Sequence, residues 1–279
     1  MANTPTIAAD QASGAPAAGP VALVRRPSPR LAEGLVTHVE RSDDVDPERA
    51  LEQWQAYVAA LQDAGYTTLE VEPAPECPDG VFIEDTMVVA GGLAVISAPP
   101  APSRAPEVDT ARVTAKAAGL TVVELADAPV DGPVALDGGD VLKVGTTVYV
   151  GVGGRTNEAG ALALKHHLAT VGREVVAVPI AKTLHLKSQV TALPDGTVIG
   201  YEPLVDDPSF WPGFLAVPEP EGSHVIVIGE DTVLMSDQAP LSAELFRSRG
   251  LTVVEVPISE FIKLEGCVTC LSVRLHDAD

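Results

Sequence analysis

The segment from residue 266 to residue 274 reads Gly-Cys-Val-Thr-Cys-Leu-Ser-Val-Arg and holds two of the three cysteines of the chain. A C-x-x-C pair is compatible with a redox motif, with half of a zinc site completed by Cys77 and His276, or with one nucleophilic cysteine served by a distant histidine. The run is β-like, so we expect Cys267 and Cys270 to lie about 10 Å apart on opposite faces of a strand. Packing of both thiols in the core is the fourth alternative.

A nucleophilic cysteine needs a general acid and base, and the chain has six histidines. His185 is distinguished by its place at the entrance of a predicted strand, in Thr183–Ser188. Acidic residues occupy equivalent entrances at residues 79–85 and at Asp137. His185 is therefore the first candidate for the acid and base, and His38 is the next.

Two acidic segments could bind a cation or orient a histidine. Glu84 and Asp85 follow an apolar Val-Phe-Ile run, so one of them should face inward, where a carboxylate needs a partner. Asp137 and Asp140 flank a Gly-Gly pair, which predicts a bulge or a close approach of the backbone to another group. Solvated turns are the alternative for both segments, and neither contains a nucleotide-binding fingerprint.

The composition excludes several classes of function. The 279 residues include 18 Lys and Arg against 39 Asp and Glu, a formal net charge of −21. Nucleic acid is therefore not an expected partner, whereas small cations are. The apolar runs are too short to cross a membrane, and sparse cysteines indicate a reducing compartment, which we expect to be the cytoplasm. The oligomeric state is open, a homo-oligomer included.

Elements that could position these residues recur as strand, turn, strand, helix, strand. We expect residues 1–20 to form a disordered tail and residues 21–279 a single α/β domain. Five similar units, the last assembled from both chain ends, predict a closed ring with its loops on one axis. An ordinary open α/β sheet is the alternative. The expected units are 81–89, 93–97, 106–118 and 121–125; 134–144, 147–152, 157–171 and 174–178; 187–193, 197–201 and 224–228; 230–235, 240–248 and 251–256; and 21–25, 47–64 and 66–71 with 267–275.

Together these segments resemble the dimethylarginine dimethylaminohydrolases, which are guanidino-group-modifying enzymes. The matching stretches run in the family's order from about Val21 to Leu275: PDGVFIEDTMVVAGGLAVIS, APSRAPEVD, LDGGDVLKVG, RTNEAG, LHLKS and KLEGCVTCLSV. The resemblance implies a five-bladed αβ propeller of ββαβ units. It also implies hydrolysis of methylated arginine to citrulline and a methylamine, with no metal and no cofactor.

The same resemblance implies roles for individual residues. Cys270 resembles the nucleophile, His185 the general acid and base, and Asp137 the carboxylate that orients the histidine. The remaining matches are implied to hold the substrate: Asp79, Glu84 and Asp85 as binding acids, Arg104 and Arg155 at the α-carboxylate end, and Leu31 and Leu264 as lining residues.

The match departs from the family pattern in two places. Leu271 stands where a second cysteine is common after the nucleophile, while the extra Cys267 lies three residues before it. Glu265 stands where aspartate is common, which puts a backbone contact to the substrate's amino end in doubt. An arginine deiminase or an amidinotransferase could use the same Cys-His-Asp set, and a non-catalytic acidic binding protein for guanidino metabolites is a rival of another class.

Overall fold

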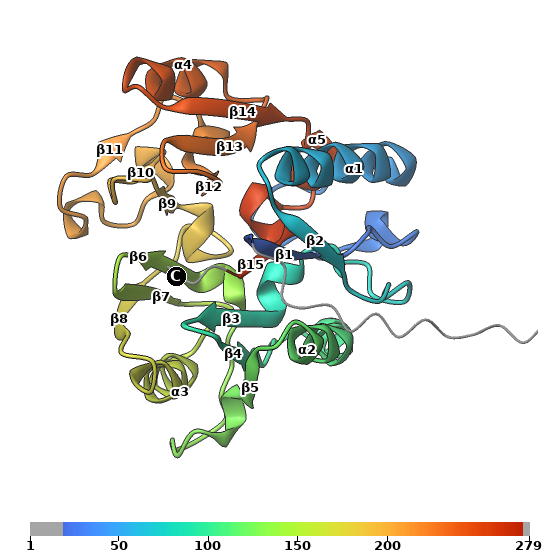
Figure 1. The fold of residues 1–279 in the computed structure, drawn as a ribbon, viewed down its shortest axis with the longest axis vertical. Coiled ribbons are helices and arrows are strands. Elements are labelled where there is room, and N and C mark those ends of the chain that lie inside the picture. The colour runs from blue at the N-terminus through green and yellow to red at the C-terminus, as the bar shows by residue number, and fades with distance from the viewer. Residues whose placement is uncertain (1–18, 276–279) are drawn as a thin grey trace, which may run out of the picture.

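The computed structural model describes residues 19–275, in which fifteen strands form five three-stranded sheets. The sheets are arranged as blades around a central channel, and four longer helices lie outside them (Figure 1). The expected five-bladed αβ propeller is confirmed. Most of the tail expected over residues 1–20, and His276, lie outside the described residues.

Every blade has the same pairing. The middle strand pairs antiparallel with the inner strand and parallel with the outer strand. In the order inner, middle, outer, the blades are β15 (Val273–Leu275), β1 (Val21–Val24), β2 (Thr67–Glu70); β3 (Met87–Ala90), β4 (Leu93–Ile96), β5 (Thr121–Glu124); β6 (Val141–Val144), β7 (Thr147–Val152), β8 (Glu174–Pro179); β9 (Val190–Ala192), β10 (Val198–Gly200), β11 (Leu215–Ala216); and β12 (Val225–Val227), β13 (Thr232–Ser236), β14 (Thr252–Val256).

A helix joins the middle and outer strands in four of the blades: α1 (Pro47–Asp63), α2 (Glu107–Ala117), α3 (Glu158–Ala169) and α4 (Pro240–Ser248). In the β9–β10–β11 blade, two 3-10 turns replace the helix. The short helix α5 (Ser259–Ile262) follows β14.

The longest helix, α1, shows how the sequence determines an element. Asp46 caps its first turn by accepting hydrogen bonds from two backbone N–H groups, and Pro47 suits the first helical position. Its buried apolar side chains recur every three or four residues, as Trp54, Tyr57 and Leu61 illustrate. This spacing forms one apolar face, which packs in the same core cluster as β1.

The two ends of the described chain close the ring. Leu23 of β1 lies opposite Val273 of β15 on one side and Leu69 of β2 on the other. Leu23 and Val273 are buried in one apolar cluster. The blade that contains the chain ends is thus built as expected, and it fixes the segment that carries Cys270.

Two expectations about strands were wrong. Four of the five inner strands begin later than predicted, because 3-10 turns occupy the residues before them, as at Ile83–Thr86 and Val268–Leu271. The segment 224–228 was expected to end the third unit, but β12 is the inner strand of the next blade. The outer strand of the third unit is the two-residue β11, which is too short to be recognised by alternation.

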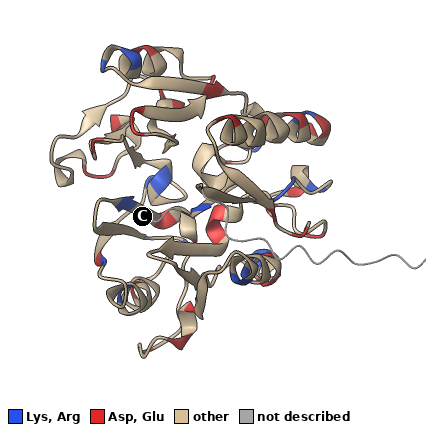
Figure 2. Ribbon diagram, viewed as in Figure 1, with Lys and Arg blue, Asp and Glu red and all other residues tan. Residues whose placement is uncertain are grey.

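Acidic residues are spread around the ring and over α1 (Figure 2). Among residues 19–275, no helix is both long and apolar enough to span a membrane.

Candidate active site

The candidate site is built on four 3-10 turns, each of which leads into an inner strand. They are Val268–Leu271, Ile83–Thr86, Gly138–Asp140 and Leu186–Ser188. Taken in this order, each of the first three turns contacts the turn that follows it. Residues far apart in the sequence are thereby brought to one end of the central axis.

The Gly138-Gly139 pair allows two of these turns to touch. A Cβ atom on Gly138 would lie 2.0 Å from the carbonyl oxygen of Glu84, and one on Gly139 would lie 2.4 Å from Nδ1 of His185. The Gly139 N–H donates a hydrogen bond of 2.8 Å to Oδ1 of Asp85. The close backbone approach predicted from the two glycines is therefore confirmed.

His185 lies between two buried carboxylates. Its Nε2 is 3.3 Å from Oδ2 of Asp137, and its Nδ1 is 4.0 Å from Oδ1 of Asp85. Burial lowers the pKa of His185, but Asp85 and Asp137 outweigh burial and raise it to about 9. The imidazole is therefore protonated at neutral pH in the free site and can act as a proton donor.

Asp85 and Arg104 form a buried ion pair at 2.5 Å, and Arg104 also contacts Glu107 at 2.8 Å. Burial raises the pKa of Asp85, but His185 and Arg104 outweigh burial and lower it to about 2. Asp85 is thus an anion at neutral pH. The resemblance places Arg104 at the α-carboxylate of the substrate. In this structure its guanidinium donates hydrogen bonds to Asp85, Glu107 and the carbonyl oxygen of Phe82.

Cys270 lies in the turn Val268–Leu271, and its N–H donates to the carbonyl oxygen of Cys267 at 3.1 Å. The two Sγ atoms are 3.4 Å apart. The expectation that Cys267 and Cys270 face opposite sides of a strand was therefore wrong. In a 3-10 turn, side chains three residues apart lie above one another, whereas in a strand they alternate.

Most of the predicted site residues line one narrow cleft. These are the charged residues Asp79, Asp85, Arg104, Arg155 and His185, with Leu264 and Cys270. The open volume of the cleft is about 20 Å³, room for about one water molecule, so an amino acid can enter only when the walls separate.

Three predicted residues do not line the cleft. Asp137 is fully buried behind His185, and Arg155 approaches it from the cleft at 3.7 Å. Leu31 is also fully buried and packs in the core, while Leu35 lines the cleft. The contact of Leu31 with substrate stays a prediction.

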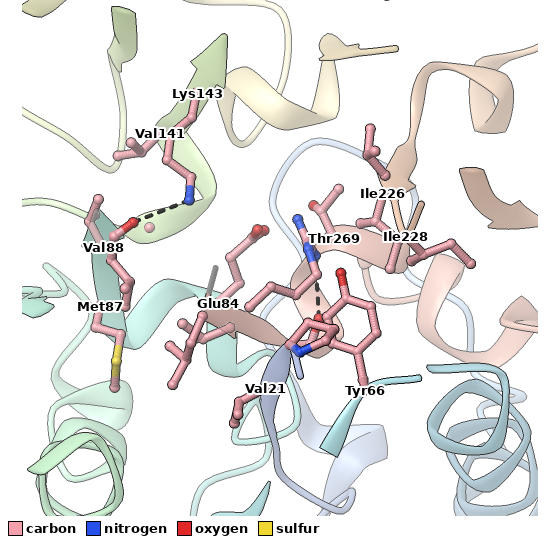
Figure 3. Close-up of a pocket in the computed structure, with 18 of the residues that line it drawn as sticks. Val21, Tyr66, Glu84, Met87, Val88, Val141, Lys143, Ile226, Ile228 and Thr269 are labelled. Carbon is pink, nitrogen blue, oxygen red and sulfur yellow. Dashed lines mark hydrogen bonds between the residues drawn. The ribbon is translucent and has the colours of Figure 1, made fainter. Parts of the chain in front are cut away.

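Glu84 is the third, and it faces the opposite compartment from its neighbour Asp85. It lines the central channel, a cavity of about 1020 Å³, and points into it (Figure 3). Its carboxylate pairs with Lys187 from the turn Leu186–Ser188. The pair Glu84–Lys187 thus lies on the channel side, while Asp85 lies on the cleft side.

The segment of residues 35–38, whose Leu35 lines the cleft, is held by two carboxylates. Asp79 accepts a hydrogen bond from the N–H of Leu35 at 3.0 Å. Glu265 accepts from the N–H groups of Thr37 and His38 at 2.7 and 2.6 Å. Glu265 has a left-handed φ of 61°, which is uncommon for a residue other than glycine. His38 lies in this segment, and the cleft histidine is His185.

Sequence reasoning assigned no role to two residues that shape the site, Asp140 and Lys187. Asp140 accepts a hydrogen bond from Thr156 at 2.6 Å and one from the N–H of Leu186 at 3.0 Å. It thereby joins the turn of Asp137 to the turn that follows His185. Asp140 could have been recognised as the second acid of the Asp-Gly-Gly-Asp stretch. No pattern in the sequence indicated a role for Lys187.

Asp85, Asp137 and His185 are also the described side chains whose ligand atoms lie close enough together, within 4.8 Å, to hold a metal ion. One observation opposes that use: Arg104 and Arg155 already place positive charge beside the two carboxylates.

Comparison with known proteins agrees with this geometry. No family model matches the chain. The chain is 56% identical over 256 residues to an N(G),N(G)-dimethylarginine dimethylaminohydrolase of Streptomyces coelicolor, covering 92% of this chain and 97% of the relative. The chain belongs to the dimethylarginine dimethylaminohydrolase family. The Pseudomonas aeruginosa member is 32% identical over 90% of this chain and 98% of its own length.

Solved structures agree as well. A dimethylarginine dimethylaminohydrolase of P. aeruginosa in complex with citrulline superposes with a TM-score of 0.82 at 28% identity. The alignment covers 92% of this chain and 99% of the solved chain. The blade arrangement and the coverage show that the match extends over the described propeller.

Proposed function

We propose that this member of the dimethylarginine dimethylaminohydrolase family hydrolyses Nω-methylated arginine to citrulline and a methylamine or dimethylamine. The observation that carries the proposal is the position of His185, which is held between Asp137 and Asp85 in the cleft lined by Cys270. A nucleophile, a proton donor and its orienting carboxylate are the groups that this reaction requires.

The first interaction with substrate is the attraction between its positive charge and the carboxylates of the cleft. A guanidinium is cationic and planar, and the carboxylates of Asp79 and Asp85 line the cleft as potential acceptors of its N–H groups. Burial raises the pKa of Asp79, and the arriving cation would favour its ionised form. Arg155 is the cleft arginine with spare donors for the α-carboxylate end, since Arg104 is bonded to Asp85 and Glu107.

The nucleophile is then ionised by the substrate. In the free site, the sulfur of Cys267, burial and the carboxylate of Glu84 raise the pKa of Cys270. A guanidinium placed against Cys270 opposes these effects and favours the thiolate. A cation in the cleft therefore increases the nucleophilicity of Cys270.

The reaction has two halves. The Cys270 thiolate attacks the guanidinium carbon, a carbon–sulfur bond forms, and the methylamine leaves with a proton from His185. The neutral His185 next accepts a proton from water, whose oxygen attacks the thiouronium carbon, and the carbon–sulfur bond breaks to release citrulline. Asp137 stabilises the imidazolium at each stage, as an orienting carboxylate does.

Incubation with asymmetric dimethylarginine, monomethylarginine and arginine in parallel, with a colour test for citrulline, tests the proposal. We expect citrulline from the methylated compounds. Citrulline from arginine alone would indicate a deiminase, and amidino transfer to an added amine an amidinotransferase. No product from any guanidine would favour a binding protein.

We also propose that the protein works in the cytoplasm. The described cysteines, Cys77, Cys267 and Cys270, are all free thiols, and the nucleophile must remain reduced. Cell fractionation followed by immunoblotting tests this placement.

A further inference from the structure

The C-x-x-C motif is not explained by the hydrolase mechanism, which uses only Cys270. The two Sγ atoms lie 3.4 Å apart, against a bond of about 2.05 Å in a disulfide. Three residues of a 3-10 turn advance the backbone by about 6 Å, which is within the Cα separation that disulfides span. Only a small movement of the two side chains is needed to join the sulfurs.

The two cysteines differ in access. Cys270 lines the cleft, so a small oxidant that enters the cleft meets this sulfur first. Cys267 lies behind it and is 4% exposed, with its Sγ also 3.3 Å from the hydroxyl of Thr269. Its Sγ lies against the Sγ of Cys270, where a thiol must stand to attack an oxidised neighbour.

We propose that Cys267 is a resolving thiol, which converts Cys270 into a reversible intramolecular disulfide after a peroxide has oxidised it. The loss of activity on oxidation rests on the proposed function, because it requires Cys270 to be the nucleophile. Formation of the disulfide does not. The switch would hold the nucleophile in a recoverable form.

The chemistry balances in two steps. The sulfur of Cys270 attacks one peroxide oxygen, the O–O bond breaks, and a sulfenic acid and one water form. The sulfur of Cys267 then attacks the sulfur of Cys270, the S–S bond forms, the S–O bond breaks, and the hydroxide leaves with the Cys267 proton as a second water. Two thiols are oxidised and one peroxide is reduced to two waters.

Hydrogen peroxide treatment of the purified full chain tests the pairing directly. We expect the oxidised protein to retain one of its three titratable thiols and to yield a peptide cross-linked between Cys267 and Cys270, lighter by two hydrogen atoms. Activity should fall in parallel and return on addition of dithiothreitol. Retention of all three thiols, or a cross-link to Cys77, would overturn the proposal.

Cys267→Ser gives the second test, with Cys77→Ser as the matched control. In excess peroxide, Cys270 of the first variant has no partner and should advance to sulfinic acid, which dithiothreitol does not reduce. Its recovered activity, relative to its own untreated sample, should be several-fold below that of wild type and of Cys77→Ser. Equal recovery would overturn the resolving role.

The mass measurement separates the two proposals. A Cys267–Cys270 disulfide that leaves turnover intact would overturn the switch and, with it, the assignment of Cys270 as nucleophile. Loss of activity with no cross-link would overturn the switch alone.

Discussion

At the scale of single residues, the candidate site is a small set of buried charges that hold one another in place. Arg104 pairs with both Asp85 and Glu107, and His185 pairs with Asp137. Burying any of these charges without a partner would cost several kcal/mol by order of magnitude. The arrangement therefore positions His185 beside the cleft before substrate arrives.

Replacing Cys270 tests its proposed role as the nucleophile. Cys270→Ser should lower kcat by at least about 10³-fold, because a serine hydroxyl is un-ionised near neutral pH and is a weak nucleophile without an adjacent base. Steady-state assays with asymmetric dimethylarginine measure the loss, with Cys77→Ser as a matched control. Activity above a tenth of wild type would rule out Cys270 as the nucleophile.

The proton on His185 makes a second prediction. In the free enzyme, NMR of labelled histidine should show His185 protonated at pH 7 and titrating near pH 9. Asp137→Asn removes one source of that shift, so the pKa of His185 should fall below its wild-type value, because burial is then opposed by Asp85 and Asp140 alone. A His185 that is already neutral at pH 7 in wild type would refute the proton-donor assignment.

The same shift has a consequence for stability. Because the folded pKa of His185, about 9, lies above its unfolded value of about 6.5, its contribution to the free energy of unfolding is full below about pH 6.5. The contribution falls between the two values and is lost as the pH rises through about 9.

At the scale of elements, the four 3-10 turns position the side chains of the candidate site. Each turn changes the direction of the chain just before an inner strand, which brings consecutive residues to different compartments. Glu84 faces the channel and Asp85 the cleft in this way. The turns pack closely only because glycines stand where they meet.

Gly139→Ala tests this packing. The new Cβ would lie 2.4 Å from Nδ1 of His185 and 2.8 Å from Oδ1 of Asp85, so the imidazole must move. We expect kcat/KM to fall by about 10²-fold or more, the range of a lost acid–base contribution. Gly154→Ala is the matched control, because its Cβ meets nothing within 4 Å. Equal kinetics in the two variants would contradict the close fit at residue 139.

At the scale of the whole molecule, the ring is closed by β1 and β15, and Cys270, the proposed nucleophile, lies in the turn that precedes β15. Closure and the active site are thus coupled through a few residues. Leu23, which faces Val273 and Leu69, is fully buried at this junction.

Leu23→Ala should therefore lower the free energy of unfolding by about 2–5 kcal/mol, the usual cost of a large-to-small core substitution. Urea titration followed by both circular dichroism and citrulline formation measures the effect. Leu162→Ala on the outside of α3, where the leucine is 57% exposed, should change stability little. A destabilised variant that keeps the wild-type midpoint for activity would contradict the coupling.

Much of this protein could be predicted from its sequence. The repeating strand and helix patterns indicated five units and the closing blade, since apolar periodicity reports which faces are buried. The motifs around residues 79–85, 137, 185 and 270 indicated the family and the candidate site, because these residue types and spacings are rarely combined otherwise. The apolar periodicity and the motif spacings are properties of the order of residues along the chain, so they can be read directly from the sequence.

The relations between neighbouring blades depended on the tertiary structure. Whether a Val-rich run enters its blade as a strand or as a 3-10 turn is decided by backbone contacts with the adjacent turn, such as that of Gly138 against Glu84. That choice placed the sulfurs of Cys267 and Cys270 at 3.4 Å and turned Glu84 away from Asp85. It was invisible in the sequence because local apolar patterns are the same for both conformations, and only contacts between residues distant in the chain distinguish their free energies.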